Sequence, residues 1–431
     1  MRDCSGVITR LGGQGDGVFD LPDGTRAYVP YTLPGERVSA RLGKPRGGGF
    51  AAQLVEIETV SPERIEAACQ HFMACGGCSL QHWTEAPYRA WKRDRLVQAL
   101  ARRDFLDIQV DDLRVVPPGS RRRIDLNVRR IGKTVVIGYH EAGSHRLVDI
   151  TECPVARPEL LMPLPALRAA LQPLLGEGKG IDLKLTAMEN GLDLLLAGPL
   201  RLDGAARSAL AMLAAEHNIR RLAWRGSQEN APPEILAQSE APYLRFGTVR
   251  VTPAPGGFLQ ATAEAEAIMA EILLAELPAK GGAAVADLFS GCGAFGLRMA
   301  EAGHRVQAYD ADKRAIAALT AAINAQGLAG RIRAEARDLE RRPLLAGDFK
   351  GLDALLLDPP RAGARAQVQG IVQAQAKQRP GLILMAACDP NSFARDARLL
   401  VDGGYQLQKL VPIDQFLWSP HLELAAVFRL S

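Results

Sequence analysis

The chain has 431 residues, of which 47% are hydrophobic and 23% charged, with a formal net charge of +4. This length exceeds the roughly 100–200 residues of one domain, so we expect two or three domains. No apolar run approaches the roughly 20 residues that cross a bilayer, and the first residues lack the apolar core of a secretory signal. We therefore expect a cytoplasmic protein without a membrane partner.

Residues 1–60 predict a small barrel that forms its own domain. Short alternating stretches are separated there by turns rich in glycine and proline. Strands this short, with such turns at this spacing, are typical of small barrels, which often bind oligonucleotides. The expected strands are residues 7–10, 17–20, 26–30, 36–42 and 50–58.

Three cysteines follow on one segment, and a fourth lies farther along the chain. Cys69, Cys75 and Cys78 have the spacing C-x5-C-G-G-C, and Cys153 is remote. Disulfides are rare in a reducing cytosol, so these thiols indicate a metal site. Structural zinc is usually held by two pairs of ligands, whereas three clustered thiolates and a distant fourth suit an iron–sulfur cluster. The cluster is favoured, and zinc remains the alternative.

Basic residues are concentrated in the next part of the chain. Residues 84–134 hold thirteen Lys and Arg against seven Asp and Glu, a local surplus of six positive charges. Arginines clustered around a helix expected at residues 87–103 are typical of a nucleic-acid-binding surface, because the guanidinium fork matches phosphate. A solvated charged face is the alternative. Strands are expected at residues 123–130 and 134–140, within a central domain of residues 61–245.

Residues 246–431 alternate regularly between strands and helices. This alternation predicts an α/β domain with a doubly wound, mostly parallel sheet, whose ligands bind at the carboxyl ends of the strands. The expected helices are residues 263–277, 296–302 and 313–326, and the expected strands are residues 284–289, 305–309, 354–357, 382–387 and 424–430.

A glycine turn follows the first of these strands. Gly291 and Gly293 stand where glycine lets the backbone approach a ligand, and the stretch also fits the dinucleotide pattern G-x-G-x-x-G. Three acids favour another cofactor: Asp287 opens the turn, Asp310 ends the next strand, and Asp358 begins D-P-P-R after a later strand. This arrangement resembles methyltransferases that depend on S-adenosylmethionine rather than dehydrogenases.

The residue after D-P-P indicates which chemical group accepts the methyl group. In the resembling motif of amino-methylating enzymes an aromatic stacks on the target base, and Arg361 stands there in this chain, which disfavours an adenine amine. Carbon 5 of uracil is a poor nucleophile, so its methylation requires a thiolate that adds to carbon 6 and a base that removes the carbon-5 proton. Cys388, after an apolar strand, and Glu423, before the last one, are the candidates. A buried inert cysteine and a surface acid are the alternative interpretations.

With these motifs the chain resembles bacterial RNA 5-methyluridine methyltransferases, in the branch that carries a TRAM barrel and an iron–sulfur cluster. The resemblance runs over nearly the whole length, through G-x4-L-x3-G-x-G, LPGE, FLQ, DLFSGCG, DPPRAG, ACDP and HLE in that order. It implies a Rossmann-like class I methyltransferase domain, an OB-like TRAM barrel at the N-terminus and a central α+β iron–sulfur domain.

The resemblance also implies roles for individual residues. Cys388 would be the nucleophile and Glu423 the base. Asp389 stands where the family more often has an amide, and its charge is expected to raise the pKa of the Cys388 thiol. The residues that would contact the cofactor or uracil are Gln260, Phe289, Gly291, Gly293, Asp310, Asp338 and Asp358. Those that would hold a [4Fe–4S] cluster are Cys69, Cys75, Cys78 and Cys153.

The function expected from the sequence is methylation of carbon 5 of a uridine in RNA, with S-adenosylmethionine as methyl donor. Ribosomal 23S RNA is the first expected substrate and transfer RNA the second. The target is expected in single-stranded or looped RNA, because the base must leave its stack to reach Cys388. A monomer is expected. A non-catalytic iron–sulfur RNA-binding protein on a methyltransferase fold and a small-molecule methyltransferase are the alternatives.

Overall fold

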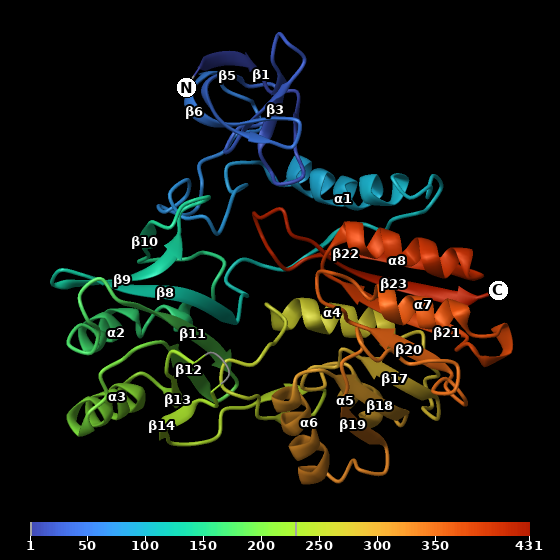
Figure 1. The fold of residues 1–431 in the computed structure, drawn as a ribbon. Helices are drawn as coiled ribbons and strands as arrows, with labels where there is room; N and C mark the ends of the chain where they lie inside the picture. Colours follow the sequence, from blue (N-terminus) through green and yellow to red (C-terminus); the bar gives the residue numbers. More distant parts are fainter. Residues whose placement is uncertain (1, 229–230) are drawn as a thin grey trace.

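The computed structural model describes residues 2–228 and 231–431, and it builds them on three large sheets (Figure 1). The N-terminal sheet has the strand order β1-β5-β6-β4-β3-β2 and curls around its own apolar core. Gly6 permits this curvature, because a Cβ there would collide with the ring of Phe19. The strands are β1 (Asp3–Val7), β2 (Arg10–Leu11), β3 (Gly17–Asp20), β4 (Arg26–Val29), β5 (Arg37–Arg46) and β6 (Gly49–Thr59).

The N-terminal sheet differs from the prediction at its first strand. The single strand predicted at residues 7–10 is instead the end of β1 and the start of β2, with Ile8 and Thr9 between them. The N–H of Ile8 bonds to the carbonyl of Glu36, whereas the N–H of Thr9 bonds to that of Val18. The chain therefore changes partner strands at this point, which a pattern of alternating residues does not reveal.

The central sheet has the order β10-β9-β8-β11-β12-β13-β14. Its neighbours are antiparallel except for β12 and β13. Helices α2 (Leu164–Leu171) and α3 (Gly204–Glu216) pack on it through the leucine-rich core that they share with the strands, in agreement with the expected α+β architecture. The strands are β8 (Arg123–Ile131), β9 (Thr134–His140), β10 (Leu147–Asp149), β11 (Gly180–Met188), β12 (Gly191–Ala197), β13 (Ile219–Arg225) and β14 (Glu234–Gln238).

The C-terminal sheet has the order β19-β18-β17-β20-β21-β23-β22-β7. Strands β17 to β21 are parallel to one another, and β23 is antiparallel to both of its neighbours, β21 and β22. From β17 the chain adds β18 and β19 on one side and then returns to add β20 and β21 on the other. In doubly wound sheets the ligand crevice lies where the strand order reverses in this way. The strands are β17 (Ala284–Leu288), β18 (Arg305–Asp310), β19 (Ile332–Ala336), β20 (Ala354–Leu357), β21 (Leu382–Ala387), β22 (Tyr405–Asp414), β23 (Glu423–Leu430) and β7 (Arg114–Val115).

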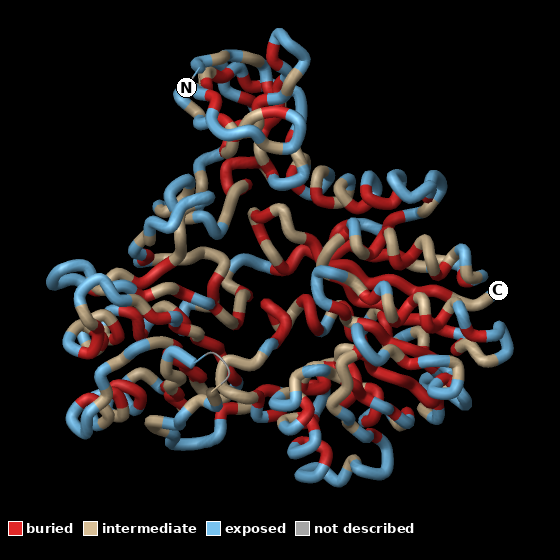
Figure 2. Tube along the Cα trace, viewed as in Figure 1, coloured by how far each residue is buried: buried red, intermediate tan, exposed pale blue. Residues whose placement is uncertain are grey.

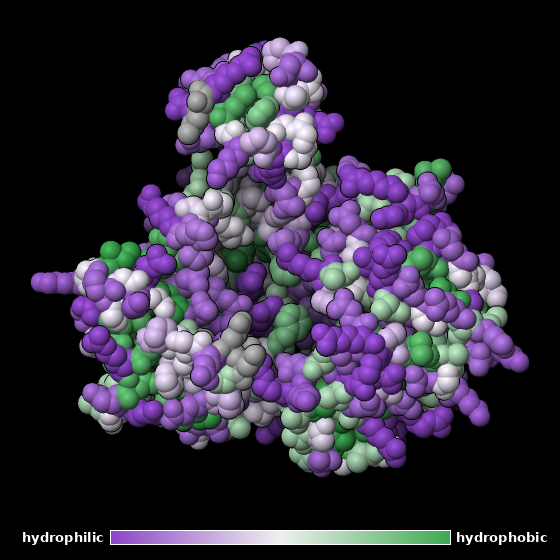
Figure 3. Space-filling view, viewed as in Figure 1, coloured by the Kyte–Doolittle hydropathy of each residue, from purple (hydrophilic) through white to green (hydrophobic). Residues whose placement is uncertain are grey.

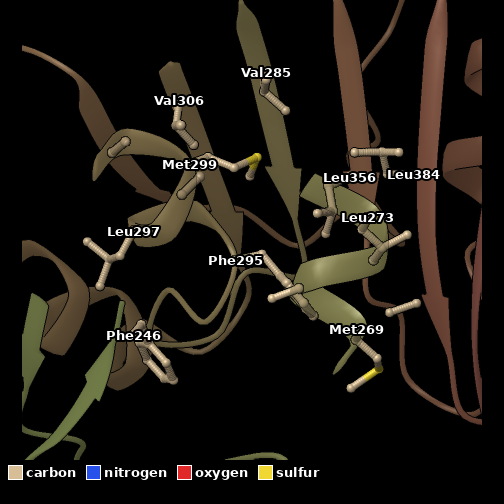
Figure 4. Packing of buried hydrophobic residues seen from close by; sticks show 14 of the residues in the cluster. Phe246, Met269, Leu273, Val285, Phe295, Leu297, Met299, Val306, Leu356 and Leu384 are labelled. Atoms are coloured by element: carbon tan, nitrogen blue, oxygen red, sulfur yellow. The ribbon is translucent and has the colours of Figure 1, made fainter. Parts of the chain in front are cut away.

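Helices cover both faces of this sheet, which confirms the predicted α/β fold. On one face Val285, Leu356 and Leu384 of adjacent strands lie near Met269 and Leu273 of α4 in one buried cluster (Figure 4). The strands are buried along most of their length, whereas the outer sides of the helices are exposed (Figure 2). No helix in the described ranges is long and apolar enough to cross a membrane. The helices are α4 (Ala263–Leu274), α5 (Gly296–Glu301), α6 (Lys313–Ala325), α7 (Arg365–Gln373) and α8 (Pro390–Asp402); a hairpin of β15 (Leu244–Phe246) and β16 (Val249–Val251) precedes them.

The segment between the cysteines and the central sheet packs on the C-terminal sheet. Helix α1 (Glu85–Ala101) contacts α8 and β22, its Leu96 and Leu100 join the core on that side, and β7 pairs in parallel with β22. The sequence predicts this segment as part of a central domain of residues 61–245. Its apolar side instead covers the C-terminal sheet. The division into three domains at those boundaries otherwise stays a prediction.

A small hydrophobic cluster, which we call the junction cluster, connects the N-terminal sheet to the rest of the chain. It includes Leu11 and Leu33 of the N-terminal sheet and Tyr88 of α1. Trp418, on the loop of residues 415–422 between β22 and β23, packs against it. The cluster therefore joins the start of the chain to a loop near its end. Its remaining members are Leu80, Trp83 and the partly buried Trp91.

Candidate active site

The predicted site residues gather at one edge of the C-terminal sheet. Phe289 follows β17, Asp310 ends β18, Asp358 follows β20 and Cys388 follows β21. Glu423 begins β23, which is antiparallel to β21 and therefore starts at the edge where β21 ends. These strand ends flank the point where the strand order of the sheet reverses, so the polar side chains predicted from scattered motifs lie at the edge where doubly wound sheets bind ligands.

The turn after β17 is shaped by two glycines and held by Asp310. Gly291 and Gly293 have φ angles of 54° and 100°, in the region that favours glycine. A Cβ on Gly293 would also stand 2.6 Å from Cδ1 of Leu319. One carboxylate oxygen of Asp310 accepts the N–H of Gly291 at 2.8 Å, and the other accepts that of Asp312 at 2.7 Å. Asp310 thus fixes the backbone of the turn.

Phe289 lies on the same turn with a φ of 63°, which is unusual for a residue with a side chain. Such strain persists only where the surroundings hold it, and it is frequent at binding sites. Phe289 lines a cavity of about 360 Å³ together with Leu339 and Pro360. The structure therefore places an aromatic ring beside an open space next to the glycine turn.

A chain of hydrogen bonds connects Asp358 to Glu423 through two glutamines. Gln260 Nε2 donates to Asp358 Oδ2 at 3.0 Å. Gln415 Nε2 donates to Gln260 Oε1 at 3.0 Å and to Glu423 Oε1 at 2.8 Å. Gln260, Gln415 and Glu423 are at most 5% exposed. The structure thus joins three predicted residues through Gln415, which the sequence did not single out.

Burial governs the protonation of these groups. It raises the pKa of the Cys388 thiol to about 12, and the carboxylates of Glu423 and Asp358 add to the effect while Arg361 opposes it. Burial and the charge of Asp358 raise the pKa of Glu423 to about 8, against the donated hydrogen bond of Gln415. Burial also raises the pKa of Asp358 to about 7. The carboxyl groups of Glu423 and Asp358 therefore have pKa values near neutral pH, as groups that act as acids and bases often do.

Two predicted residues, Asp338 and Asp389, hold backbone N–H groups of their own segments. Asp338 follows β19, but its carboxylate accepts the N–H groups of Glu340 and Arg341 in its own turn, and it is outside the hydrogen-bonded chain. Asp389 does raise the pKa of Cys388, but less than burial and the other two carboxylates do. Its oxygen accepts the first N–H groups of α8 as an N-cap, which holds the charge there.

The four cysteines line one cavity of about 320 Å³. Arg361 and His421 also line it, so this cavity adjoins the catalytic edge. Within residues 2–228 and 231–431, no three Cys, His, Asp or Glu side chains stand where they could hold a metal ion. The thiols therefore surround the space rather than meet at one point. The N–H of Gly77 donates to Cys75 Sγ at 3.4 Å.

The basic stretch of residues 84–134 is not one continuous RNA-facing surface. Lys92 has no exposed surface and Arg122 only 4%, because both pair with buried carboxylates. Arg93 and Arg130 donate to backbone carbonyl groups. Hydrophilic side chains nevertheless surround the hollow between the sheets on the face drawn in Figure 3. The basic residues of the stretch that remain exposed are Arg89, Arg102, Arg103, Arg114, Arg129 and Lys133.

Comparison with known proteins decides the family. A family model described as the methyltransferase small domain matches residues 253–379. A Caulobacter vibrioides protein named as an uncharacterized RNA methyltransferase is 41% identical, over 99% of this chain and 100% of that protein. The chain belongs to the RNA methyltransferases. A further RNA methyltransferase, from Brucella suis, is 42% identical over 98% of this chain and 96% of its own.

Two more distant proteins resemble this RNA methyltransferase over its whole length. The 23S rRNA (uracil(1939)-C(5))-methyltransferase of Shewanella woodyi is 29% identical, over 98% of this chain and 95% of that protein. The structure of the Pyrococcus abyssi tRNA (uracil-54, C5)-methyltransferase, in complex with S-adenosyl-L-homocysteine, aligns with a TM-score of 0.76 and 22% identity, over 99% and 100% of the two chains. The latter likeness shows a shared fold.

Sequence reasoning missed the residues that anchor the loop of residues 415–422 in this RNA methyltransferase. Lys92 Nζ donates to Asp414 Oδ1 at 2.7 Å and to the carbonyl groups of Phe416 and His421. Tyr88 donates its hydroxyl to the other oxygen of Asp414. The available signal is that Lys92 lies in the apolar stripe of α1, four residues after Tyr88. A lysine at such a position indicates a buried partner.

Proposed function

We propose that this RNA methyltransferase methylates carbon 5 of a uridine in RNA. The observation that carries the proposal is the thiol of Cys388 beside the buried carboxylate of Glu423 at the ligand-binding edge of the sheet. Carbon-5 methylation requires these two groups, because uracil must first be activated by a nucleophile and later lose its carbon-5 proton. The 29% identical relative, whose name specifies uracil carbon 5, supports the same chemistry.

The glycine turn supports S-adenosylmethionine as the methyl donor. Gly291 and Gly293 give the turn positive φ angles that suit a close approach to a ligand, and Asp310 keeps lone pairs that suit ribose hydroxyl groups after it has accepted two N–H groups. The cavity beside Phe289 offers an aromatic surface next to that turn. When bound, S-adenosylmethionine supplies the methyl group. This chain's residues bind and orient it at the end of β17.

The steps proposed for the protein's own groups begin with Cys388. Its sulfur bonds to carbon 6 of uracil as Asp358 takes the thiol proton, and the electrons of the C5=C6 double bond move toward the carbonyl at carbon 4. Carbon 5 then takes the methyl group. Glu423 removes the remaining carbon-5 proton, the C5=C6 bond re-forms and Cys388 leaves carbon 6, recovering its proton from Asp358.

We propose that Cys69, Cys75, Cys78 and Cys153 hold an iron–sulfur cluster rather than a zinc ion. A zinc ion needs all its sulfur ligands about 2.3 Å from one point. The thiols instead surround a cavity of about 320 Å³, and a backbone N–H donates to one of them, Cys75, as backbone N–H groups do in cluster sites. When bound, a [4Fe–4S] cluster supplies a rigid link between these segments, and the methyl transfer above uses no electron from it.

We propose 23S ribosomal RNA as the substrate, with transfer RNA as the alternative. The relative named for 23S rRNA is similar along 98% of this chain, whereas the tRNA enzyme shares the fold at 22% identity. The target uridine leaves its stack to bring carbon 6 to Cys388, so looped or single-stranded RNA is favoured.

RNA substituted with 5-fluorouridine tests this function. Because Glu423 cannot remove fluorine from carbon 5, the wild-type protein with S-adenosylmethionine is expected to form a protein–RNA adduct that survives denaturation. Cys388→Ala is expected to form none, and Cys4→Ala, a cysteine in the N-terminal sheet, is the matched control that forms it. Absence of an adduct with both 23S and transfer RNA would contradict the proposal, and an adduct with one of them identifies the substrate.

Asp310→Asn is expected to weaken the binding of S-adenosylhomocysteine by about 10- to 100-fold, because charge-assisted hydrogen bonds worth about 1.5–3 kcal/mol are lost at the glycine turn. Isothermal titration calorimetry measures the change. Asp312→Asn is the control, since asparagine caps α6 as well as aspartate does. Equal affinities of the two variants would show that Asp310 does not organise the cofactor site.

A further inference from the structure

We propose that Gln415 is a positioning residue that holds Glu423 in place to take the proton from carbon 5. This inference rests on the function proposed above and extends it to a residue that contacts neither substrate nor cofactor in that mechanism. The observation behind it is that both donors and the acceptor oxygen of one buried amide are hydrogen-bonded, and that one of the two donors faces the base.

The orientation of the Gln415 amide follows from a backbone donor. Its Oε1 accepts the N–H of Thr262 at 3.3 Å, and a peptide N–H can only donate. The amide nitrogen must therefore face the opposite way, where its two hydrogens reach Gln260 Oε1 and Glu423 Oε1. Thr262 is itself the N-cap of α4 and accepts the N–H of Ala265. A helix end thus sets the direction in which Gln415 donates.

The position of Gln415 along the chain is anchored as well. It directly follows Asp414, whose carboxylate is bonded to Lys92 and Tyr88. It also begins the loop of residues 415–422, which ends next to Glu423. Backbone and side chain of Gln415 are therefore both held, and the carboxylate that receives its hydrogen bond is held with them.

The hydrogen bond from Gln415 favours the form of Glu423 that acts as a base. Among the described residues, Gln415 provides the side-chain donor to Glu423, and a donated hydrogen bond stabilises the ionised carboxylate. Arg361 also favours ionisation, whereas burial and the charge of Asp358 oppose it. With Oε1 occupied by Gln415, Oε2 is the oxygen that takes the proton.

The variant Gln415→Met tests the inference, because methionine has a similar length but no donor. On the unsubstituted RNA that the trapping experiment identifies, turnover is expected to fall about 10- to 100-fold. A denaturation-stable adduct that carries the methyl group is expected to accumulate, because proton removal is slowed more than methyl transfer. The pH at which kcat reaches half of its maximum is expected to increase by about one unit, because the pKa of Glu423 increases.

The control is Thr32→Val. Thr32 is a buried residue between β4 and β5 whose hydroxyl donates to the carbonyl of Val29, so its loss lowers the unfolding midpoint without changing the pH profile or trapping an adduct. If Gln415→Met does not fold, Gln415→Glu serves instead, because it keeps the acceptor for Thr262 and removes both donors. A pH profile and adduct level like those of wild type would overturn the inference. Failure of the wild-type protein to react with 5-fluorouridine RNA would instead overturn the proposed function.

Discussion

Glu423→Gln is expected to stop the reaction after the methyl group has been transferred. Glutamine keeps the shape of the side chain and accepts the hydrogen bond from Gln415, but it cannot take the carbon-5 proton. Turnover is expected to fall by about 10²–10⁴-fold, the usual contribution of a general base. A denaturation-stable adduct on unsubstituted RNA, labelled through the methyl group of S-adenosylmethionine, measures the stalled species.

The same base sets the pH dependence of the wild-type enzyme. The pKa of Glu423 lies at about 8, above its usual range, so most of the carboxyl is protonated at pH 7 and becomes ionised as the pH rises. The rate of proton removal is therefore expected to increase between pH 6.5 and 8.5, and Glu423→Gln loses this increase. Glu271→Gln, exposed on α4, is the control with unchanged turnover. A Glu423→Gln enzyme with full turnover and no adduct would exclude Glu423 as the base.

Lys92→Met is expected to produce the largest loss of stability. Lys92 and Asp414 both lack exposed surface, and removing one partner of a buried ion pair costs about 3–5 kcal/mol because the other charge stays buried. The carbonyl groups of Phe416 and His421 lose their donor as well. Urea unfolding of the whole protein measures the change.

An exposed pair on the same helix provides the control for Lys92. Arg89 bonds to Glu85 on the outer side of α1, and such a pair is worth about 0.5 kcal/mol. Arg89→Met is therefore expected to be nearly neutral. The double variant Lys92→Met with Asp414→Asn is expected to recover part of the lost stability, because it removes the unpaired charge. Equal losses for Lys92→Met and Arg89→Met would show that the buried pair does not stabilise the fold.

The sequence predicted the parallel part of the C-terminal sheet best. The strands expected at residues 354–357 and 382–387 agree with β20 and β21 residue for residue. Strands that are buried on both faces are continuous apolar runs with sharp ends, so their limits are visible in the sequence. Most of the central sheet was missed, because strands such as β11 mix charged and apolar residues and one face of the sheet is partly exposed.

Site residues that stand next to a strand end could be predicted from the sequence. Residues whose role depends on partners far away in the sequence could not. Cys388 and Glu423 lie in short motifs next to apolar strands, so the sequence pointed to both. Gln415 was missed because its partner Gln260 is 155 residues away, and Lys92 because Asp414 is 322 residues away. Nothing local to these residues indicates the contact. Asp338 follows β19 and accepts N–H groups of its own turn, and its contact with the cofactor stays a prediction.

The junction cluster also affects the order in which parts of a newly synthesised chain can fold. The N-terminal and central sheets pair strands that are close in sequence, so they can form while the ribosome is still translating. Helix α1 cannot pack in its final position at that stage. Its Lys92 has no partner until Asp414 has been synthesised and β22 has paired with β23. Trp418, which packs against the junction cluster, emerges later still. The N-terminal and central sheets can therefore fold before residues 405–430 have been made, whereas the catalytic edge closes only after them.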